Sequence, residues 1–101
     1  MTMQIQIIGK QIETGDALRT HVEQQVEASI QKYFDRGAQV NITFSKQGHI
    51  FRANCHVHLD SGLQIQASGE DSDIYASFDK GMIKIEKQLR RYKRRLKNHH
   101  N

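Results

Sequence analysis

The stretch FRANCHVHLDSGLQIQA, residues 51–67, determines the fold class that the sequence predicts. Apolar and polar residues alternate on both sides of Asp60-Ser61-Gly62, and a period of two is typical of half-buried β-strands. A short glycine-containing segment between two such runs indicates a β-hairpin. Because each strand has one apolar and one polar face, we expect a sheet that is covered on one side only.

The chain before this hairpin adds two more strands. Residues 3–8 alternate in the same way, and so does a run centred on Ile42. The dipeptide Gln47-Gly48 separates that second run from the hairpin and indicates a tight turn. The apolar residues that define the two runs are Met3, Ile5, Ile7, Val40, Ile42 and Phe44.

Two helices are predicted. Between the first two strands, apolar residues recur every four positions and form a stripe of about five turns at Leu18, Val22, Val26, Ile30 and Phe34. Thr14 is suited to cap this helix, and Gly37 is suited to end it in a left-handed conformation. Residues 69–72 are expected to connect the hairpin to a second helix, with Ser72 or Asp73 as its cap.

The predicted order is β-α-β-β-β-α, a two-layer α+β domain with a four-stranded mixed sheet and two helices on one face. The first strand, helix and second strand form a crossover, so those two strands are expected to be parallel. The last three strands are expected to form an antiparallel meander. A chain of 101 residues is expected to be one domain, residues 1–101, with residues 97–101 as a tail or the start of a linker.

The composition indicates the class of protein. Hydrophobic residues make up 37% and charged residues 26% of the chain, which is typical of a globular domain. The single cysteine, Cys55, excludes an internal disulfide and suits a reducing cytosol. No apolar run approaches the ~20 residues of a membrane span, and the N-terminus is too polar for a secretory signal. We therefore expect a cytoplasmic protein.

The charge is concentrated near the C-terminus. The segment from Lys80 to Lys97 holds nine Lys and Arg residues and one acid, Glu86, so its net charge is +8, while the rest of the chain is −4. On a helix with 100° per residue, apolar and basic residues of this region lie on opposite sides. The apolar side comprises Ile74, Phe78, Met82, Ile85, Leu89, Tyr92 and Leu96. The basic side comprises Lys80, Lys84, Lys87, Arg91, Arg94 and Arg95.

This stripe of one sign favours a polyanionic partner. A solvated helix face usually mixes charges, because acid–base pairs at i, i+4 stabilise a helix and like-charge pairs destabilise it. Successive members of the stripe, such as Lys80, Lys84 and Lys87, are like-charge neighbours at i+3 or i+4. A helix on a membrane surface would need a free apolar face, and this helix needs its apolar face for the core. We therefore expect nucleic acid as the partner.

The last predicted helix also carries a specific order of residue types. An acid, a hydrophobic residue, Tyr-Ala and an Asp are followed by Lys-hydrophobic-Glu-basic-Gln-Leu and a basic run, in the stretch DIYASFDKGMIKIEKQLRRYKRRLK. The matching residues are Asp73, Tyr75, Ala76, Asp79, Lys84, Glu86, Lys87, Gln88 and Leu89. In this order the helix resembles that of the bacterial ribosome hibernation promoting factors, the ribosome-associated translation inhibitor family. ALRTHVE from Ala17, KYFDRG from Lys32 and FRANCHVHLDSG from Phe51 are similar to the same family, so the resemblance covers essentially the whole chain.

The resemblance implies an N-terminal ribosome-binding domain with a fold similar to a double-stranded-RNA-binding domain. Such factors bind the small ribosomal subunit where messenger and transfer RNA sit. They block translation in starved or stationary-phase cells and promote paired, inactive ribosomes. The implication is steric inhibition, with no catalytic residue, cofactor, metal or small-molecule substrate. The implied rRNA-binding residues are Lys84, Lys87, Arg91 and Arg95, with Lys80, Arg90 and Arg94 as neighbours. Additional candidate contacts are Arg19, Lys32, Arg36 and Tyr75.

The chain departs from many relatives on the first predicted helix. Residues that are often lysine in the family are here Gln24, Gln25, Glu27, Ala28 and Gln31, so the contribution of this helix to binding stays open. The ending RRYKRRLKNHH resembles the entrance to the linker of a long form. In a long form, a C-terminal domain pairs with a second copy on another ribosome. Whether the chain is a complete short form or the first domain of a long form stays open.

The sequence offers three alternatives to ribosome binding: a metal site, an RNA-processing enzyme and a generic double-stranded-RNA-binding module. Cys55-His56-Val57-His58 suggests a metal site, but on a strand His56 and His58 share one face while Cys55 points to the other. Two histidines without a third ligand indicate an ordinary polar sheet face. An RNA-processing enzyme would need a nucleophile motif, a glycine-rich phosphate loop or a complete metal set, and the sequence has none of these. A generic double-stranded-RNA-binding module is the principal alternative.

Overall fold

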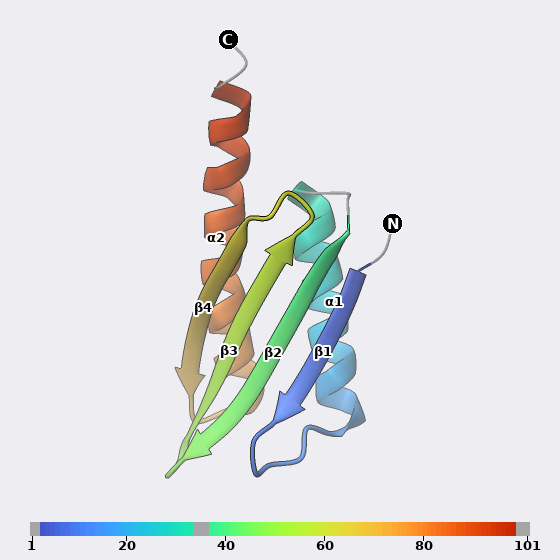
Figure 1. Cartoon of the computed structure of the whole chain (residues 1–101). Coiled ribbons are helices and arrows are strands. Elements are labelled where there is room, and N and C mark those ends of the chain that lie inside the picture. Colours follow the sequence, from blue (N-terminus) through green and yellow to red (C-terminus); the bar gives the residue numbers. More distant parts are fainter. Residues whose placement is uncertain (1–2, 34–36, 99–101) are drawn as a thin grey trace.

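The computed structural model describes residues 3–33 and 37–98, the last three of these by their backbone alone. In this part of the chain the elements are β1 (Met3–Gly9), α1 (Gly15–Tyr33), β2 (Ala38–Gln47), β3 (Ile50–Leu59), β4 (Gln64–Asp71) and α2 (Ile74–Asn98). The strands form one layer, and both helices pack against the same face of it (Figure 1). The predicted two-layer α+β domain is confirmed.

The sheet has the strand order β1-β2-β3-β4. β1 is parallel to β2, whereas the β2–β3 and β3–β4 pairs are antiparallel. These pairings confirm the parallel crossover and the antiparallel meander. The two predicted turns contain Gly48 and Gly62, with φ angles of 62° and 95°, which glycine adopts without strain.

The core fills the space between the sheet and the helices. Its largest fully buried side chains are Phe44, Phe78, Ile30, Ile42, Ile85 and Leu89. Burying an aliphatic or aromatic side chain of this size contributes about 1.5–3 kcal/mol, so the apolar stripe of α2 holds the helix firmly against the sheet. The predicted core positions Phe34 and Leu96 lie outside the described side chains.

β4 is longer than the sequence predicts, because it continues to Asp71 through residues expected to be a connection. The cause is a close crossing of β4 and the first turns of α2. A Cβ atom at Gly69 would lie 2.2 Å from the carbonyl oxygen of Ser77 and 2.5 Å from the amide nitrogen of Gly81. Glycine in a strand commonly marks such an approach of two backbones. The crossing places α2 beside the open edge of β4.

α2 begins immediately after Asp73. The Oδ1 atom of Asp73 accepts a hydrogen bond from the amide of Tyr75 at 3.1 Å, and its carbonyl oxygen accepts one from the amide of Ser77 at 3.0 Å. A carboxylate in this position caps free amides and interacts favourably with the helix dipole. Of the two predicted caps, Ser72 and Asp73, the structure selects Asp73.

Candidate nucleic-acid interface

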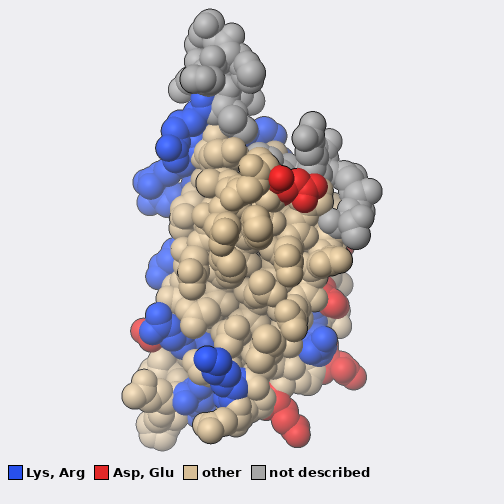
Figure 2. All heavy atoms as spheres, viewed as in Figure 1, with Lys and Arg blue, Asp and Glu red and all other residues tan. Residues whose placement is uncertain are grey.

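The side of α2 opposite the core carries exposed lysines and arginines, and we call this surface the basic face. All seven predicted rRNA-binding residues are exposed: Lys80, Lys84, Lys87, Arg90, Arg91, Arg94 and Arg95. Figure 2 shows Lys and Arg along the flank where α2 runs, while the centre of the sheet face carries little charge. The structure therefore brings the seven residues together along one helix.

Glu86, the one acid between Lys80 and Lys97, faces α1 and not the basic face. Its carboxylate accepts hydrogen bonds from the hydroxyls of Ser29 at 3.3 Å and Tyr33 at 3.4 Å, and it lies 3.7 Å from the ammonium of Lys32. All three partners belong to α1. Glu86 therefore joins the two helices, and the basic face keeps a single sign.

The first two lysines of the basic face bind the edge of the sheet. Lys80 donates to the carboxylate of Asp71 at 2.7 Å and to the carbonyl oxygen of Glu70 at 3.3 Å. Lys84 donates to the carbonyl oxygen of Ser68 at 2.7 Å. β4 is an edge strand, and lysines placed on an edge prevent another chain from pairing with it. We call Lys80 and Lys84 the edge lysines.

The contact between Lys80 and Asp71 also affects the acidity of the carboxyl group. Hydrogen bonds from the Lys80 ammonium and from the Asp73 amide hold the pKa of Asp71 below its usual value of 3.8. Both bonds favour the ionised form, because an ionised carboxylate is the better acceptor. Asp71 is therefore negative and paired at neutral pH.

The spacing of the edge lysines follows from the geometry of the two elements. β4 and α2 run in opposite directions (Figure 1). Four residues of a helix advance about 6 Å and two residues of a strand advance about 6.7 Å. The step from Lys80 to Lys84 therefore matches the step from Glu70 to Ser68. Continued along both elements, the same step brings Gln88 level with Gln66.

The remaining basic residues form what we call the distal cluster: Lys87, Arg90, Arg91, Arg94 and Arg95. Within the described part of the chain, these five side chains make no hydrogen bond or ion pair. Holding five unpaired cations on successive turns costs electrostatic repulsion, which a polyanion would relieve. The distal cluster is the part of the basic face that is free to bind a partner.

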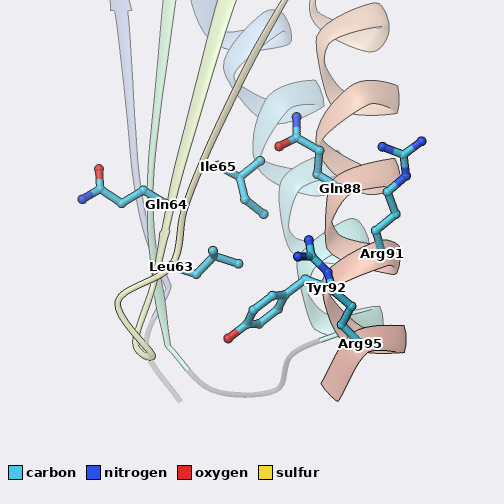
Figure 3. A pocket seen from close by; sticks show the side chains of 7 residues that line it. All are labelled: Leu63, Gln64, Ile65, Gln88, Arg91, Tyr92 and Arg95. Atoms are coloured by element: carbon cyan, nitrogen blue, oxygen red, sulfur yellow. The ribbon is translucent and has the colours of Figure 1, made fainter. Parts of the chain in front are cut away.

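A hollow of about 360 Å³ lies between the distal cluster and the start of β4. It is lined by Leu63, Gln64, Ile65, Gln88, Arg91, Tyr92 and Arg95. In Figure 3 the side chains of Leu63 and Ile65 point toward α2, and the guanidinium of Arg95 extends toward β4. The basic face is therefore not smooth at this end but borders a partly apolar depression.

The additional candidate contacts have different surroundings. Arg19 is exposed on α1, whereas the charge of Lys32 is offset by Glu86. The ring of Tyr75 lies edge-on to His21 with a centroid distance of 5.3 Å, so this tyrosine takes part in the contact between the helices. Arg36 lies outside the described residues.

The histidines of β3 lie on the uncovered face of the sheet, as the alternation predicts. The Nε2 atom of His56 is 3.0 Å from the Oε1 atom of Gln64. Cys55 points the other way and is fully buried, and burial raises the pKa of its thiol to about 12. Among the residues described by the structure, no three His, Cys, Asp or Glu side chains gather as a metal site would require.

Sequence reasoning missed three contributors to this surface: Gly69, Asp71 and Leu63. Each acts through a contact between β4 and α2, and helix periodicity carries no information about the neighbouring strand. The regular step Lys80, Lys84, Gln88 would have indicated the edge contact if the packing of β4 against α2 had been known.

The chain matches the model of the Sigma 54 modulation protein / S30EA ribosomal protein family over residues 5–97. It belongs to this family, and the resemblance to the ribosome hibernation promoting factors is confirmed. In the described residues, no helix is apolar over a length that could cross a membrane.

Relatives of two lengths match the chain. It is 43% identical over 99 residues to the ribosome hibernation promotion factor of Rhizobium meliloti (strain 1021), covering 98% of this chain and 52% of that protein. It is 38% identical over 99 residues to the ribosome hibernation promoting factor of Salmonella typhimurium, covering 96% of this chain and 100% of that protein. The chain thus spans about half the length of the first relative and the whole of the second.

A solved structure supports the fold. The crystal structure of the Thermus thermophilus Protein Y N-terminal domain superposes with a TM-score of 0.80 at 30% sequence identity. The match covers 91% of this chain and 99% of that domain. The arrangement of the sheet and helices is therefore shared with that domain.

Proposed function

We propose that this domain binds the small ribosomal subunit through the basic face of α2, in the channel that carries messenger and transfer RNA. Occupation of that channel would block translation by steric exclusion, in the cytoplasm of starved or stationary-phase cells. The observation that carries the proposal is the distal cluster, five exposed cations without partners among the described residues. The names of the relatives as ribosome hibernation factors support the same function.

The chemistry required is the neutralisation of rRNA phosphates. Lysine supplies a point charge, whereas arginine can also bind a phosphate through two parallel hydrogen bonds. Because α2 is anchored in the core, its cations are presented without the entropy cost of ordering a flexible tail. All seven residues of the basic face are proposed contacts. The distal cluster supplies most of the charge, since Lys80 and Lys84 are also bound to β4.

We also propose that promotion of inactive paired ribosomes needs more than this domain. About half of the Rhizobium relative lies outside the matched region. A self-associating part would be located in that unmatched half. The purified domain is therefore expected to bind single ribosomes and to pair them poorly.

The test is co-sedimentation of the purified domain with separated small and large subunits, in the presence and absence of messenger RNA and initiator transfer RNA. The expected result is binding to the small subunit that those ligands displace, and inhibition of cell-free translation without cleavage of RNA. Equal affinity for isolated duplex RNA and for ribosomes would identify a generic double-stranded-RNA-binding module. Cleaved rRNA would identify an enzyme.

A further inference from the structure

We propose that the hollow between β4 and the distal cluster is a binding site for a single unstacked nucleotide of an RNA strand. The base would enter the hollow, and the phosphate would lie on Arg95 at its rim, with the positive charge of Arg91 one turn away. This inference rests on the proposed function and specifies one element of the ligand that the basic face recognises.

The walls of the hollow suit a planar aromatic base. Leu63, just before β4, and Ile65, in β4, provide an apolar floor, and Tyr92, partly buried against the core, provides an aromatic ring from α2 (Figure 3). RNA-binding proteins commonly place unstacked bases against aromatic rings or guanidinium planes. A base in water would therefore gain contacts here that a phosphate or a hydrated ion would not.

The edge of β4 supplies polar groups that can read a base. The carbonyl of Leu63 faces β3, where it accepts a hydrogen bond from the amide of Leu59 at 2.9 Å. The carbonyls of Ser68 and Glu70 face the opposite way and receive the edge lysines. Because these directions alternate along a strand, the amide and carbonyl of Gln64, which lines the hollow, also face the open edge. Donors and acceptors of this kind pair with the edges of a nucleobase.

The charge of the hollow favours an anion at its rim. Arg91 and Arg95 both line it and are separated by one helical turn. The guanidinium of Arg95 extends toward β4, whereas that of Arg91 points away from the strand (Figure 3). A phosphate next to an inserted base would therefore contact Arg95, while Arg91 adds positive charge on the outer side of the helix.

Other occupants fit this geometry less well. An added β-strand, from a peptide or a second copy, needs an open edge of about five residues. Lys80 and Lys84 already bind the edge at Glu70 and Ser68, so only the first residues of β4 remain open. A duplex would not enter, because its bases are stacked. A volume of about 360 Å³ lies at the small end of ligand sites, which suits one nucleotide.

The test is a set of NMR titrations of the domain with adenosine 5′-monophosphate, uridine 5′-monophosphate and inorganic phosphate, observed through backbone amides. The nucleotides are expected to produce saturable shifts at residues 63–66 and 88–95, with at most small shifts at Lys80 and Lys84. Inorganic phosphate is expected to shift α2 only. Identical patterns for nucleotides and phosphate would overturn the inference, since they would show charge binding without a base site. Concentration-dependent broadening at β4 without ligand would also overturn it, by identifying a second copy as the occupant.

A matched pair of variants tests the location. Gln88→Glu keeps the shape of a side chain in the hollow and adds a negative charge, so it is expected to weaken nucleotide binding about tenfold. Gln39→Glu adds the same charge on the exposed face of β2 and is expected to leave binding unchanged. Equal effects of the two variants would contradict the assignment. If nucleotides fail to bind while small subunits still co-sediment, only this inference falls; if both fail, the proposed function falls too.

Discussion

The two ends of the basic face carry the same kinds of side chain and differ in what holds them. At the N-terminal end, Lys80 and Lys84 reach across to carbonyl oxygens on the edge of β4. At the other end, the distal cluster has no partner among the described residues. A uniform stripe of charge thus divides into two lysines that close a strand edge and five cations without a partner in the described part of the chain.

The difference shows that position on a helix wheel does not determine the role of a residue. Lys84 and Lys87 are one turn apart and share one arc, yet only Lys84 donates to β4. The direction of the side chain and the nearness of a strand decide which ammonium group already has a hydrogen-bond partner. The following predictions test this division, beginning with the largest expected effect.

Replacing Lys87, Arg91 and Arg95 with glutamine removes three charges from the distal cluster. Ribosome affinity is expected to fall roughly 100-fold at ~0.15 M salt, because about three phosphate contacts and their released counterions are lost. Stability is expected to change by less than about 0.5 kcal/mol, since the three side chains have no partner in the described structure. Co-sedimentation at several concentrations, together with thermal melting, measures both.

The matched control removes three exposed cations outside α2: Lys10, Lys46 and Arg52. This variant has the same net charge as the triple variant of the distal cluster, and it is expected to keep most of the ribosome affinity of the wild type. Equal loss in the two triple variants would show that net charge, and not the basic face, governs binding.

Gly69→Ala is expected to destabilise the domain by about 1–3 kcal/mol or more, because the new Cβ meets backbone atoms that cannot rotate away. The nearest are the carbonyl oxygen of Ser77 at 2.2 Å and the amide nitrogen of Gly81 at 2.5 Å. α2 would have to move from β4, which would also separate the edge lysines from their carbonyls. Urea denaturation followed by circular dichroism tests this, and an unchanged midpoint would mean that the crossing is looser than described.

Lys84→Met keeps most of the aliphatic chain and removes the hydrogen bond to Ser68. The expected loss of stability is about 0.5–1.5 kcal/mol. Lys87→Met, one turn further on, is the control and is expected to change stability by less than about 0.5 kcal/mol. If the two variants melt alike, Lys84 has no special role at the edge of β4.

Asp71→Asn tests the smallest effect, which depends on pH. The folded-state pKa of Asp71 is lowered, chiefly by Lys80, so its stabilisation is present above the usual value of 3.8 and is lost as the pH falls below it. The variant is expected to melt slightly below the wild type near pH ~6 and to converge with it near pH ~2.5. Glu23→Gln, on the exposed face of α1, is the control. A constant difference between wild type and Asp71→Asn at every pH would exclude the ionised pair with Lys80.

Much of the fold follows from the sequence because its patterns are local. Alternation around Ile42 and Cys55 predicts the strands, and the spacing from Leu18 to Ile30 predicts α1. The predicted end of β4 was wrong. Within the sequence Gly69 suggests a turn, whereas in the structure it allows the backbone of α2 to cross β4 closely. A contact between distant segments overrides the local signal at that position.

The candidate site shows the same limit. Helix periodicity places six of the seven basic residues, all but Arg90, on one exposed arc and Phe78 and Leu89 on the buried one, and both placements hold in the structure. The pairing of Lys80 with Asp71 and the hollow beside Tyr92 depend on where β4 lies. Those features require the packing of the strand, which no pattern within the helix records.

The most direct test of this division is the salt dependence of small-subunit binding by two variants of equal charge. The logarithm of affinity plotted against the logarithm of salt concentration is expected to have a slope of roughly −4 for the wild type, from about five phosphate contacts. Changing Lys87 and Arg91 together to glutamine should reduce the magnitude of this slope by about 2. Changing Lys80 and Lys84 together to glutamine should reduce it by less than about 1. Equal reductions, or a larger one for Lys80 and Lys84, would contradict the assignment of the distal cluster as the principal RNA-binding surface.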